Sequence, residues 1–448
     1  MIQKNDKKII NGWCMYDWAN SVYNLVITAA IFPIYYSTIT TETGINGEIL
    51  NNQVKFFGFS FTNTSLYSYA ISASFLIMAL LSPILSGIAD TGGKKKMFLK
   101  FFAYLGSLCC CGLFFFERDT LELGILLSMG ASIGFTGSLV FYNAYLPEIS
   151  TEKEFDRVSA KGFGMGYAGS VILLGINLAF VMKPDLFGFP VDEAGKAGTL
   201  PTRFGFLLVG IWWMSFAQMP FRRLPKDKSG TKITTQLITD GINRLKNVYK
   251  ELKTLKLTRN YLLSFFFYNA GVQAIMLLAA SFGKVALNHT QVTLIGTIFV
   301  IQFLAIVGAY IFSFLAKKLG NITSIAISIA LWVVVCLIAY FIEKENVPQF
   351  IGLAVLVGLM MGAIQSMSRS TYAKFIPVNT NDHTSYYSFY DVIEKFSVVI
   401  GTFVFAAVND ITNNMRFSAL ALAVFFIIGL ILIKRIPSKH IYNTSLKK

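Results

Sequence analysis

Twelve long apolar segments joined by short polar connections predict an all-α polytopic membrane protein. Of the 448 residues, 54 % are hydrophobic and only 14 % are charged, which is more apolar than a water-soluble domain requires. A bilayer core about 30 Å thick takes roughly 20 apolar residues in a helix that rises about 1.5 Å per residue. The apolar runs are too continuous for the alternating strands of a membrane β-barrel. We therefore predict 12 transmembrane helices.

The predicted spans are apolar runs of suitable length that carry few charges. They cover 16–39, 65–89, 97–116, 121–146, 162–184, 203–220, 260–283, 291–316, 322–342, 349–374, 385–408 and 415–435. The first is not a cleavable signal, because it carries Asp17 and is followed by eleven further spans.

The distribution of basic residues predicts the orientation of these helices. When successive connections are assigned to alternate sides, 30 of the 39 Lys and Arg residues fall on one side and 8 on the other, with Lys395 inside a span. The positive-inside rule makes the richer side cytoplasmic, so both termini are predicted to be cytoplasmic. The excess charge then serves topology and membrane lipids rather than nucleic acid. We expect a multi-pass protein of the plasma membrane, which is the inner membrane if the source is bacterial.

The long connection Phe221–Arg259 divides the spans six and six. It holds 11 basic and 3 acidic residues. Its apolar residues recur at helical spacing, at Leu237, Ile242, Leu245, Val248, Tyr249 and Leu252. This pattern predicts an amphipathic helix, lying on the inner leaflet or serving as a solvated linker. The expected organisation is an N-terminal six-helix bundle at 1–221, a basic amphipathic cytoplasmic linker at 222–259, and a C-terminal six-helix bundle with a short basic tail at 260–448.

A row of polar side chains lies on one face of the first span. At about 100° per residue, Asp17, Asn20, Ser21, Asn24 and Thr28 share roughly 100° of arc. Hydrocarbon would not tolerate this face, so it looks toward water, a substrate or other helices. Asp17, Asn20, Asn24 and Thr28 are therefore candidates for a substrate cavity. The alternative is hydrogen bonding between helices, with Asp17 as an N-terminal cap.

Three amides in the second half extend this candidate cavity. Asn269 and Gln273 lie in the seventh span, and Gln365 lies in the tenth. A buried hydrogen bond between helices explains each of them equally well.

The connection after the second span reads "SGIADTGGKKK", Ser86–Lys96. Its adjacent glycines permit a tight turn. The stretch resembles the loop signature of the major facilitator superfamily, which it matches at Ser86, Ile88, Ala89, Asp90, Gly93, Lys94 and Lys95. Ser86 replaces the usual first glycine and Thr91 the usual arginine. The resemblance implies the major facilitator fold, with two six-helix bundles that alternately open to either side.

Further motifs narrow the resemblance. "YDWANS" at 16–21, "SPILSGIAD" at 82–90, "FYNAYLPEIS" at 141–150, "VSAKGFGMGYAGS" at 158–170 and "YDVIEKFSVVIG" at 390–401 are similar to the vacuolar amino-acid effluxers linked to autophagy and their prokaryotic relatives. This similarity implies a small polar solute, an amino acid or similar, that is exported or exchanged.

The resemblance places a cytoplasmic gate around Asp90. In this architecture Asp90 faces the start of the eleventh span, where Thr384 or Ser385 and free backbone donors lie. A carboxylate there favours the closed gate by about 0.3–1 kcal/mol. The other expected gate residues are Gly93, Lys94, Lys95, Glu148 and Arg369. The lysines from Lys94 to Lys96 can pair with Glu148, Glu152 or Asp156, or serve topology only.

Ionisable residues in the eleventh span give a second hypothesis. Asp391 and Lys395 are four residues apart and are expected to pair, which leaves Glu394 less neutralised. Asp17, Asp391, Glu394 and Lys395 are thus candidates for proton coupling, with a structural charge cluster as the alternative. Arg369 is expected to pair with Glu394 or Asp391, to meet a substrate carboxylate, or to snorkel.

These features together predict a secondary active transporter. The expected partners are a small-molecule substrate, membrane lipids and protons as a candidate coupling ion, and the chain is expected to act as a monomer. Phosphate-binding glycines, a zinc-ligand helix and a nucleophile elbow are absent from the sequence, so we expect no enzyme activity, no cofactor and no metal. The alternatives are a drug or lysolipid exporter, and a membrane sensor or scaffold that does not transport.

Overall fold

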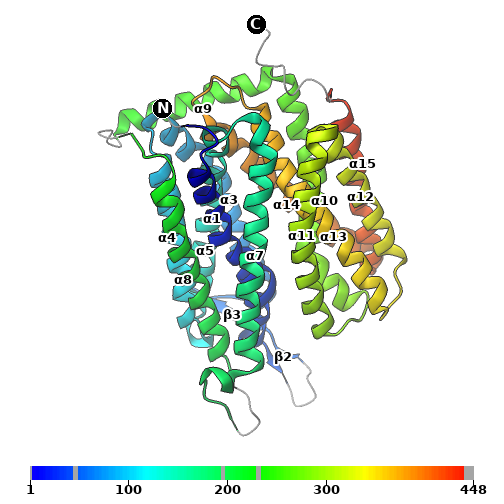
Figure 1. The fold of residues 1–448 in the computed structure, drawn as a ribbon. Coiled ribbons are helices and arrows are strands. Elements are labelled where there is room, and N and C mark those ends of the chain that lie inside the picture. Colours follow the sequence, from blue (N-terminus) through cyan, green and yellow to red (C-terminus); the bar gives the residue numbers. More distant parts are fainter. Residues whose placement is uncertain (1–2, 44–48, 193–196, 229–233, 438–448) are drawn as a thin grey trace.

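A computed structural model describes residues 3–43, 49–192, 197–228 and 234–437. Its helices form two groups joined by one helix (Figure 1). The N-terminal group contains α1 (Lys7–Val22), which continues through a π-helix (Tyr23–Ile31) into α2 (Phe32–Thr40), then α3 (Asn63–Gly92), α4 (Lys95–Gly112), α5 (Leu121–Asn143), α6 (Leu146–Ile149), α7 (Phe155–Met182) and α8 (Leu200–Arg223). The joining helix is α9 (Thr235–Thr254). The C-terminal group contains α10 (Lys256–Val285), α11 (Gln291–Leu319), α12 (Asn321–Phe341), α13 (Val347–Phe375), α14 (His383–Thr412) and α15 (Met415–Lys434).

Two small hairpins precede α3. Strand β1 (Glu42–Thr43) pairs with β2 (Ile49–Asn51), and β3 (Gln53–Phe56) pairs with β4 (Phe59–Thr62), both antiparallel. The second hairpin turns at Phe57 and Gly58, which both have positive φ angles, 48° and 85°. Two such residues in a two-residue turn match the twist of the flanking strands. Short 3₁₀ turns lie at Leu113–Phe115, Arg118–Thr120, Glu152–Glu154 and Pro184–Phe187.

The all-α polytopic prediction is confirmed. Eleven helices of the described residues are long and apolar enough to cross a membrane. The remaining predicted span corresponds to α14, which has 30 residues and is long enough, at about 45 Å, but carries charges in its first half. The first helix begins at Lys7, nine residues before the predicted span, with Asp6 as its N-cap. Asp17 is therefore inside the helix, and its interpretation as an N-terminal cap was wrong.

Helix α9 is amphipathic, as predicted, but it packs on protein rather than only on a leaflet. Leu237, Val248 and Leu252 are buried. A Cβ placed on Gly87 of α3 would lie 2.3 Å from the carbonyl oxygen of Gly241, so the two backbones touch. The helix also reaches the C-terminal group. It therefore spans both groups.

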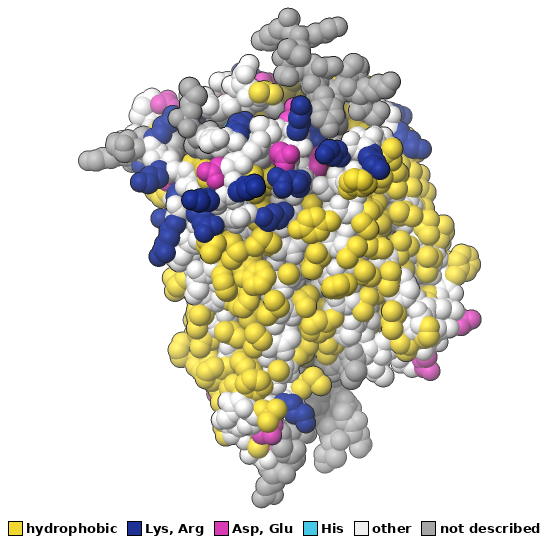
Figure 2. Space-filling view, in the orientation of Figure 1, with side chains coloured by type: hydrophobic (Ala, Val, Ile, Leu, Met, Phe, Trp, Pro, Cys, Tyr) yellow, Lys and Arg dark blue, Asp and Glu magenta, His cyan; other side chains and the backbone are white. Residues whose placement is uncertain are grey.

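Charged residues mark one end of the molecule. Lys and Arg gather in a band at the end where α1 begins, above a broad hydrophobic belt (Figure 2). We call this the basic end; α15 also ends there and α9 lies along it (Figure 1). A belt of this kind is the surface that a bilayer covers.

Candidate functional site

A deeply buried ionic contact joins α1 to α13. The guanidinium of Arg369 donates to Asp17 Oδ2 from Nη1 and from Nη2, each at 3.0 Å. It also donates to Ser159 Oγ at 3.0 Å and to the Ser159 carbonyl at 2.9 Å. The rings of Phe163 and Trp13 lie 4.0 and 4.7 Å from the guanidinium carbon. The side chains of Arg369 and Asp17 are only 4 % and 6 % exposed. An arginine of the C-terminal group is thus enclosed by the N-terminal group.

The predicted pairing of Arg369 with Glu394 or Asp391 was wrong. Asp391 instead pairs with Lys395 of its own helix, as its spacing predicts. It also accepts from Ser82 Oγ of α3 at 3.1 Å. Helix–helix packing places Arg369 beside α1, so its partner is Asp17, 352 positions away in the sequence. Spacing along the sequence cannot reveal such a partner.

A second polar contact between the groups lies at the start of α7. Asp156 accepts from Lys374 Nζ at 2.6 Å and from Asn321 Nδ2 at 2.7 Å. Lys374 Nζ also donates to Asn321 Oδ1 at 2.7 Å, and Asn321 donates to Thr371 Oγ1 at 2.9 Å. All four residues are buried. Asp156 was expected only as a partner for Lys94–Lys96, and its contact with Lys374 was not predicted. The available signal was a lysine at the end of the long apolar run 349–374.

The third contact is the one expected from the loop signature. Asp90, near the end of α3, accepts from the backbone N–H of Ser385 at 2.7 Å and of Thr384 at 3.3 Å. It also accepts from Ser385 Oγ at 2.7 Å. Asp90 therefore lies at the first turn of α14, where the helix dipole favours a negative charge. Gly93 ends α3 with φ 61°, a left-handed conformation that suits glycine.

The lysines after Gly93 act within the N-terminal group and its linker. Lys95 pairs with Glu148, one of the expected acceptors. Lys94 donates to the Lys228 carbonyl at 3.2 Å, and Lys96 donates to the Leu224 carbonyl at 2.8 Å. Neither Lys94 nor Lys96 pairs with Glu148, Glu152 or Asp156 among the described residues, so the pairing alternative was wrong for both. A role in topology, which was favoured for Lys96, stays a prediction. None of the three lysines forms a hydrogen bond or ion pair to the C-terminal group among the described residues.

The polar side chains of the first span do not share one solvent-accessible surface. Asp17 is sealed in its ion pair. Asn20 is 1 % exposed, and neither atom of its amide has a hydrogen-bond partner among the described residues. Asn24 is exposed and Thr28 is partly exposed. Because lipid would penalise an amide at this depth, we expect Asn24 to face the space between the groups. The prediction of a cavity-lining side chain was wrong for Asn20.

The helix itself changes geometry within this row. Residues Tyr23–Ile31 form a π-helix, which has more residues per turn than an α-helix. The 100° spacing used for the sequence prediction therefore fails beyond Val22. Asn24 and Thr28 lie in this irregular segment, and π-helical turns are often found at functional sites.

The amides of the C-terminal group differ in their accessibility. Asn269 is buried and donates to Ser397 Oγ at 2.5 Å, the hydrogen bond between helices that was the alternative reading. Gln273 is partly exposed, and its Nε2 lies 3.5 Å from Glu394 Oε1. Gln365 accepts from the hydroxyl of Tyr167 in α7 and so joins the two groups. Glu394 forms no ion pair among the described residues, whereas its neighbours Asp391 and Lys395 pair with each other.

Polar contacts between the groups are confined to the basic end. Among the described residues, the hydrogen bonds that cross from one group to the other involve Asp17, Ser82, Asp90, Asn143, Asp156, Ser159 and Tyr167 on the N-terminal side. Each lies in the half of its helix nearer the basic end when α1, the π-helix and α2 are taken as the one continuous helix Lys7–Thr40. The opposite halves of this continuous helix and of α7, α13 and α14 carry no such bond in the part of the chain that the structure describes.

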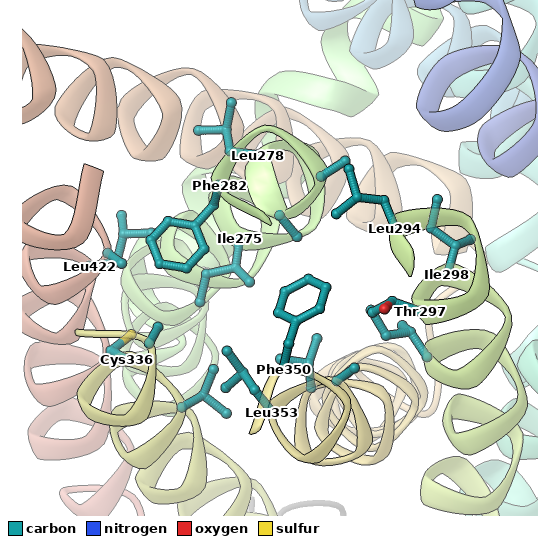
Figure 3. Close-up of a pocket in the computed structure, with 18 of the residues that line it drawn as sticks. Ile275, Leu278, Phe282, Leu294, Thr297, Ile298, Cys336, Phe350, Leu353 and Leu422 are labelled. Atoms are coloured by element: carbon teal, nitrogen blue, oxygen red, sulfur yellow. The ribbon is translucent and has the colours of Figure 1, made fainter. Parts of the chain in front are cut away.

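An apolar pocket lies inside the C-terminal group (Figure 3). Its volume is about 90 Å³, and its walls include Phe282, Leu294, Phe350 and Leu422. Thr297 presents one of its few polar atoms, and that hydroxyl already donates to the Thr293 carbonyl at 2.7 Å. The pocket is far smaller than the roughly 300–1,000 Å³ of ordinary ligand sites.

No metal site is found among the described residues, since no three His, Cys, Asp or Glu side chains cluster there.

Comparisons with known proteins agree with this architecture. Residues 5–443 match the family model described as "Vacuole effluxer Atg22 like". The chain is 30 % identical over 438 residues to an uncharacterised MFS-type transporter, YxiO, of Bacillus subtilis, covering 98 % of this chain and 97 % of that protein. It is 23 % identical to autophagy-related protein 22 of Neurospora crassa, over 92 % of this chain and 68 % of that protein.

A solved structure shares the fold. The transporter FucP of the major facilitator superfamily, in the outward conformation, superposes with a TM-score of 0.66 at 15 % identity, covering 96 % of this chain and 98 % of FucP. The predicted major facilitator fold is thereby confirmed. The chain belongs to the vacuole effluxer Atg22-like family of major facilitator superfamily transporters.

Proposed function

We propose that the protein is a secondary active transporter that moves a small polar solute, an amino acid or similar, by alternating access. Membership of a transporter family supports transport as the general function, and the family's description as vacuole effluxers supports export or exchange. Both groups of one chain contribute to the path, so a monomer suffices.

One observation carries the proposal: the polar contacts between the groups lie only toward the basic end. Such an arrangement closes one mouth and leaves the opposite halves of the helices free to separate. Asn24, Thr28 and Gln273 lie beyond the closed contacts and keep accessible polar groups. These side chains suit a solute with hydrogen-bonding groups. We assign the closed mouth to the cytoplasm, on the positive-inside rule and the basic band of Figure 2.

Glu394 is our candidate for proton coupling. It lies beside Gln273 of α10 and on the same helix as the Asp391–Lys395 pair. Tyr268 of α10 and Ser82 of α3 are the other polar groups near this cluster. A carboxylate without its own cation can take up and release a proton during the cycle, whereas Asp391 is held by Lys395.

The runner-up, a drug or lysolipid exporter, has weaker support. It needs a wide apolar cavity between the two groups, and the enclosed apolar pocket lies within the C-terminal group and offers only about 90 Å³. A larger apolar groove, of about 520 Å³, is lined by the linker helix and the C-terminal group and not by both groups.

The test is a binding screen followed by flux. The purified protein is screened by thermal shift against amino acids, peptides, sugars and nucleosides, because a ligand of the folded state raises its melting temperature. The hit is then loaded into proteoliposomes, and exchange is followed with and without a pH gradient. We expect an amino acid to stabilise the protein and to exchange across the membrane. We also expect Asn24→Ala to lower its affinity at least tenfold.

Asn247→Ala is the matched control, because Asn247 is an exposed asparagine of α9. If Asn24→Ala and the control bind the solute equally, the site is misplaced. Binding without flux would select the sensor or scaffold instead. Flux that ignores the pH gradient in the wild type and in Glu394→Gln would remove proton coupling alone.

A further inference from the structure

A groove outside the solute path lies between α9, α10 and α14. Its volume is about 520 Å³, within the roughly 300–1,000 Å³ typical of ligand sites. Its floor is apolar and is formed by Leu252, Leu262, Phe266, Phe389 and Ile393. These residues come from all three helices, so an occupant would contact the linker helix and two membrane spans at once.

The groove opens toward the outside of the molecule. Leu263, on its wall, is 48 % exposed, and Tyr249, at its rim, is 49 % exposed. Helix α10 is long and apolar enough to cross a membrane and α14 packs against it, whereas α9 lies along the basic end (Figure 1). The apolar part of the groove therefore lies at the height of lipid tails, and its α9 side lies at the height of headgroups.

Two cations border the headgroup side. The walls include Lys253 of α9 and Arg259 of α10, both exposed. The Lys253 ammonium lies 4.5 Å from the ring centre of Tyr249, and Arg259 Nη1 donates to the Lys253 carbonyl at 3.3 Å. Neither cation has an ion-pair partner among the described residues. By contrast, Arg244 of the same linker helix pairs with Asp382.

We propose that the groove binds one anionic glycerophospholipid of the adjacent leaflet. Its phosphate lies between Lys253 and Arg259, and an acyl chain lies along Leu262, Phe266 and Phe389. Cations at the headgroup level attract anionic lipids. The apolar floor of the groove packs against part of the lipid's acyl chain. The two unpaired charges favour a lipid with a net negative headgroup over a zwitterionic one.

The lipid would also favour the conformer with the closed basic end. The bound molecule touches α14 through Phe389 and Ile393, and α14 begins at the Asp90 contact. A ligand that fits this arrangement of α9, α10 and α14 better than another shifts the population toward it.

The experiment measures lipid retention by native mass spectrometry of the full chain. Purified protein is titrated with phosphatidylglycerol, phosphatidylcholine or glycerol 1-phosphate. We expect one phosphatidylglycerol per chain, and at least tenfold weaker binding in the double variant Lys253→Gln/Arg259→Gln. Lys246→Gln/Lys250→Gln is the matched control, since it removes two exposed charges of the linker helix outside the groove. Leu263→Gln, a partly exposed position, should weaken phosphatidylglycerol without unfolding the protein.

Three outcomes would overturn the proposal. An equal loss of phosphatidylglycerol binding in both double variants would show that the lipid is attracted to the basic surface in general and not to the groove. Equal binding of phosphatidylcholine would remove the role of the two cations. Glycerol 1-phosphate that binds as tightly as the lipid, with no effect of Leu263→Gln, would remove the role of the apolar floor. None of these results depends on which solute is transported.

Discussion

The two groups are joined at the basic end by contacts of different chemistry. At the α3–α14 contact, Asp90 accepts from backbone N–H groups of a helix start. At the α7–α13 contact, Asp156 meets the ammonium of Lys374, and nearby Asp17 meets the guanidinium of Arg369. Helix-start donors remain partly satisfied by water when the carboxylate leaves, but a buried cation loses the carboxylate that it contacts directly.

This difference predicts unequal roles in opening. A carboxylate at a helix start contributes about 0.3–1 kcal/mol, whereas leaving one member of a buried ion pair unpaired costs about 3–5 kcal/mol. We therefore propose that the α3–α14 contact is the part of the gate that is released more easily, and that the two buried ion pairs set most of the free-energy difference between the closed and open basic end.

The largest expected effect follows loss of the counter-charge of Arg369. Asp17→Ala leaves a buried guanidinium unpaired, so we expect the closed state to lose about 3–5 kcal/mol. The measurement is the rate of thiol labelling at a cysteine placed at the closed mouth. The double variant Asp17→Ala/Arg369→Met should recover much of the loss. The exposed pair of Arg118 and Glu42 is the control, and its removal should cost less than about 1 kcal/mol.

A slightly smaller effect is expected at the second ion pair. Asp156→Ala leaves Lys374 in contact with Asn321 Oδ1, which still accepts a hydrogen bond. We therefore expect the closed state to lose about 3 kcal/mol, at the lower end of the range for a broken buried ion pair, as measured by the same labelling assay. A loss larger than that of Asp17→Ala would reverse the proposed order of the two pairs.

An intermediate effect is expected from crowding the first pair. A Cβ on Gly162 would lie 2.4 Å from Asp17 Oδ2 and 2.8 Å from Arg369 Nη2. Gly162→Ala should therefore displace the pair and cost about 1–3 kcal/mol of closed-state stability. Gly175→Ala in the same helix is the matched control, because nothing lies within 4 Å of its added carbon. If Gly162→Ala and Gly175→Ala have the same melting temperature and the same rate of thiol labelling, the claim that an added Cβ at Gly162 displaces the ion pair is contradicted.

The smallest effect is expected at the helix start. Asp90→Asn keeps an oxygen that accepts from Ser385 but removes the charge, so the closed state should lose about 0.3–1 kcal/mol. The wild type should show a weaker closed state as salt rises, and the variant should not. A loss above about 3 kcal/mol would mean that this contact, and not the buried ion pairs, dominates the gate.

Local patterns in the sequence predicted local features well. Apolar runs located the spans, and four-residue spacing predicted the Asp391–Lys395 pair. The loop signature predicted where Asp90 lies. Charge and apolarity along the chain determine the spans and the Asp391–Lys395 pair, whereas the place of Asp90 is what the resemblance to the major facilitator superfamily implied.

Features set by packing between distant segments were missed. The partner of Arg369 depends on how α13 meets α1, and Asn321 reaches Asp156 only because α12 starts beside α7. The π-helix also escaped prediction, because its residues read as an ordinary apolar helix. The early start of α1 at Lys7 was missed because a helix can extend past the membrane into water, beyond the apolar run.

The most direct test of the gate is a distance between spin labels across the basic end. Labels at Arg157→Cys, at the start of α7, and Lys317→Cys, near the end of α11, are placed in a background without the five native cysteines. We predict a short, narrow distance distribution in the wild type. The double variant Lys374→Met/Arg369→Met should add a longer population. Identical distributions in the two proteins would contradict the claim that buried ion pairs hold this end closed.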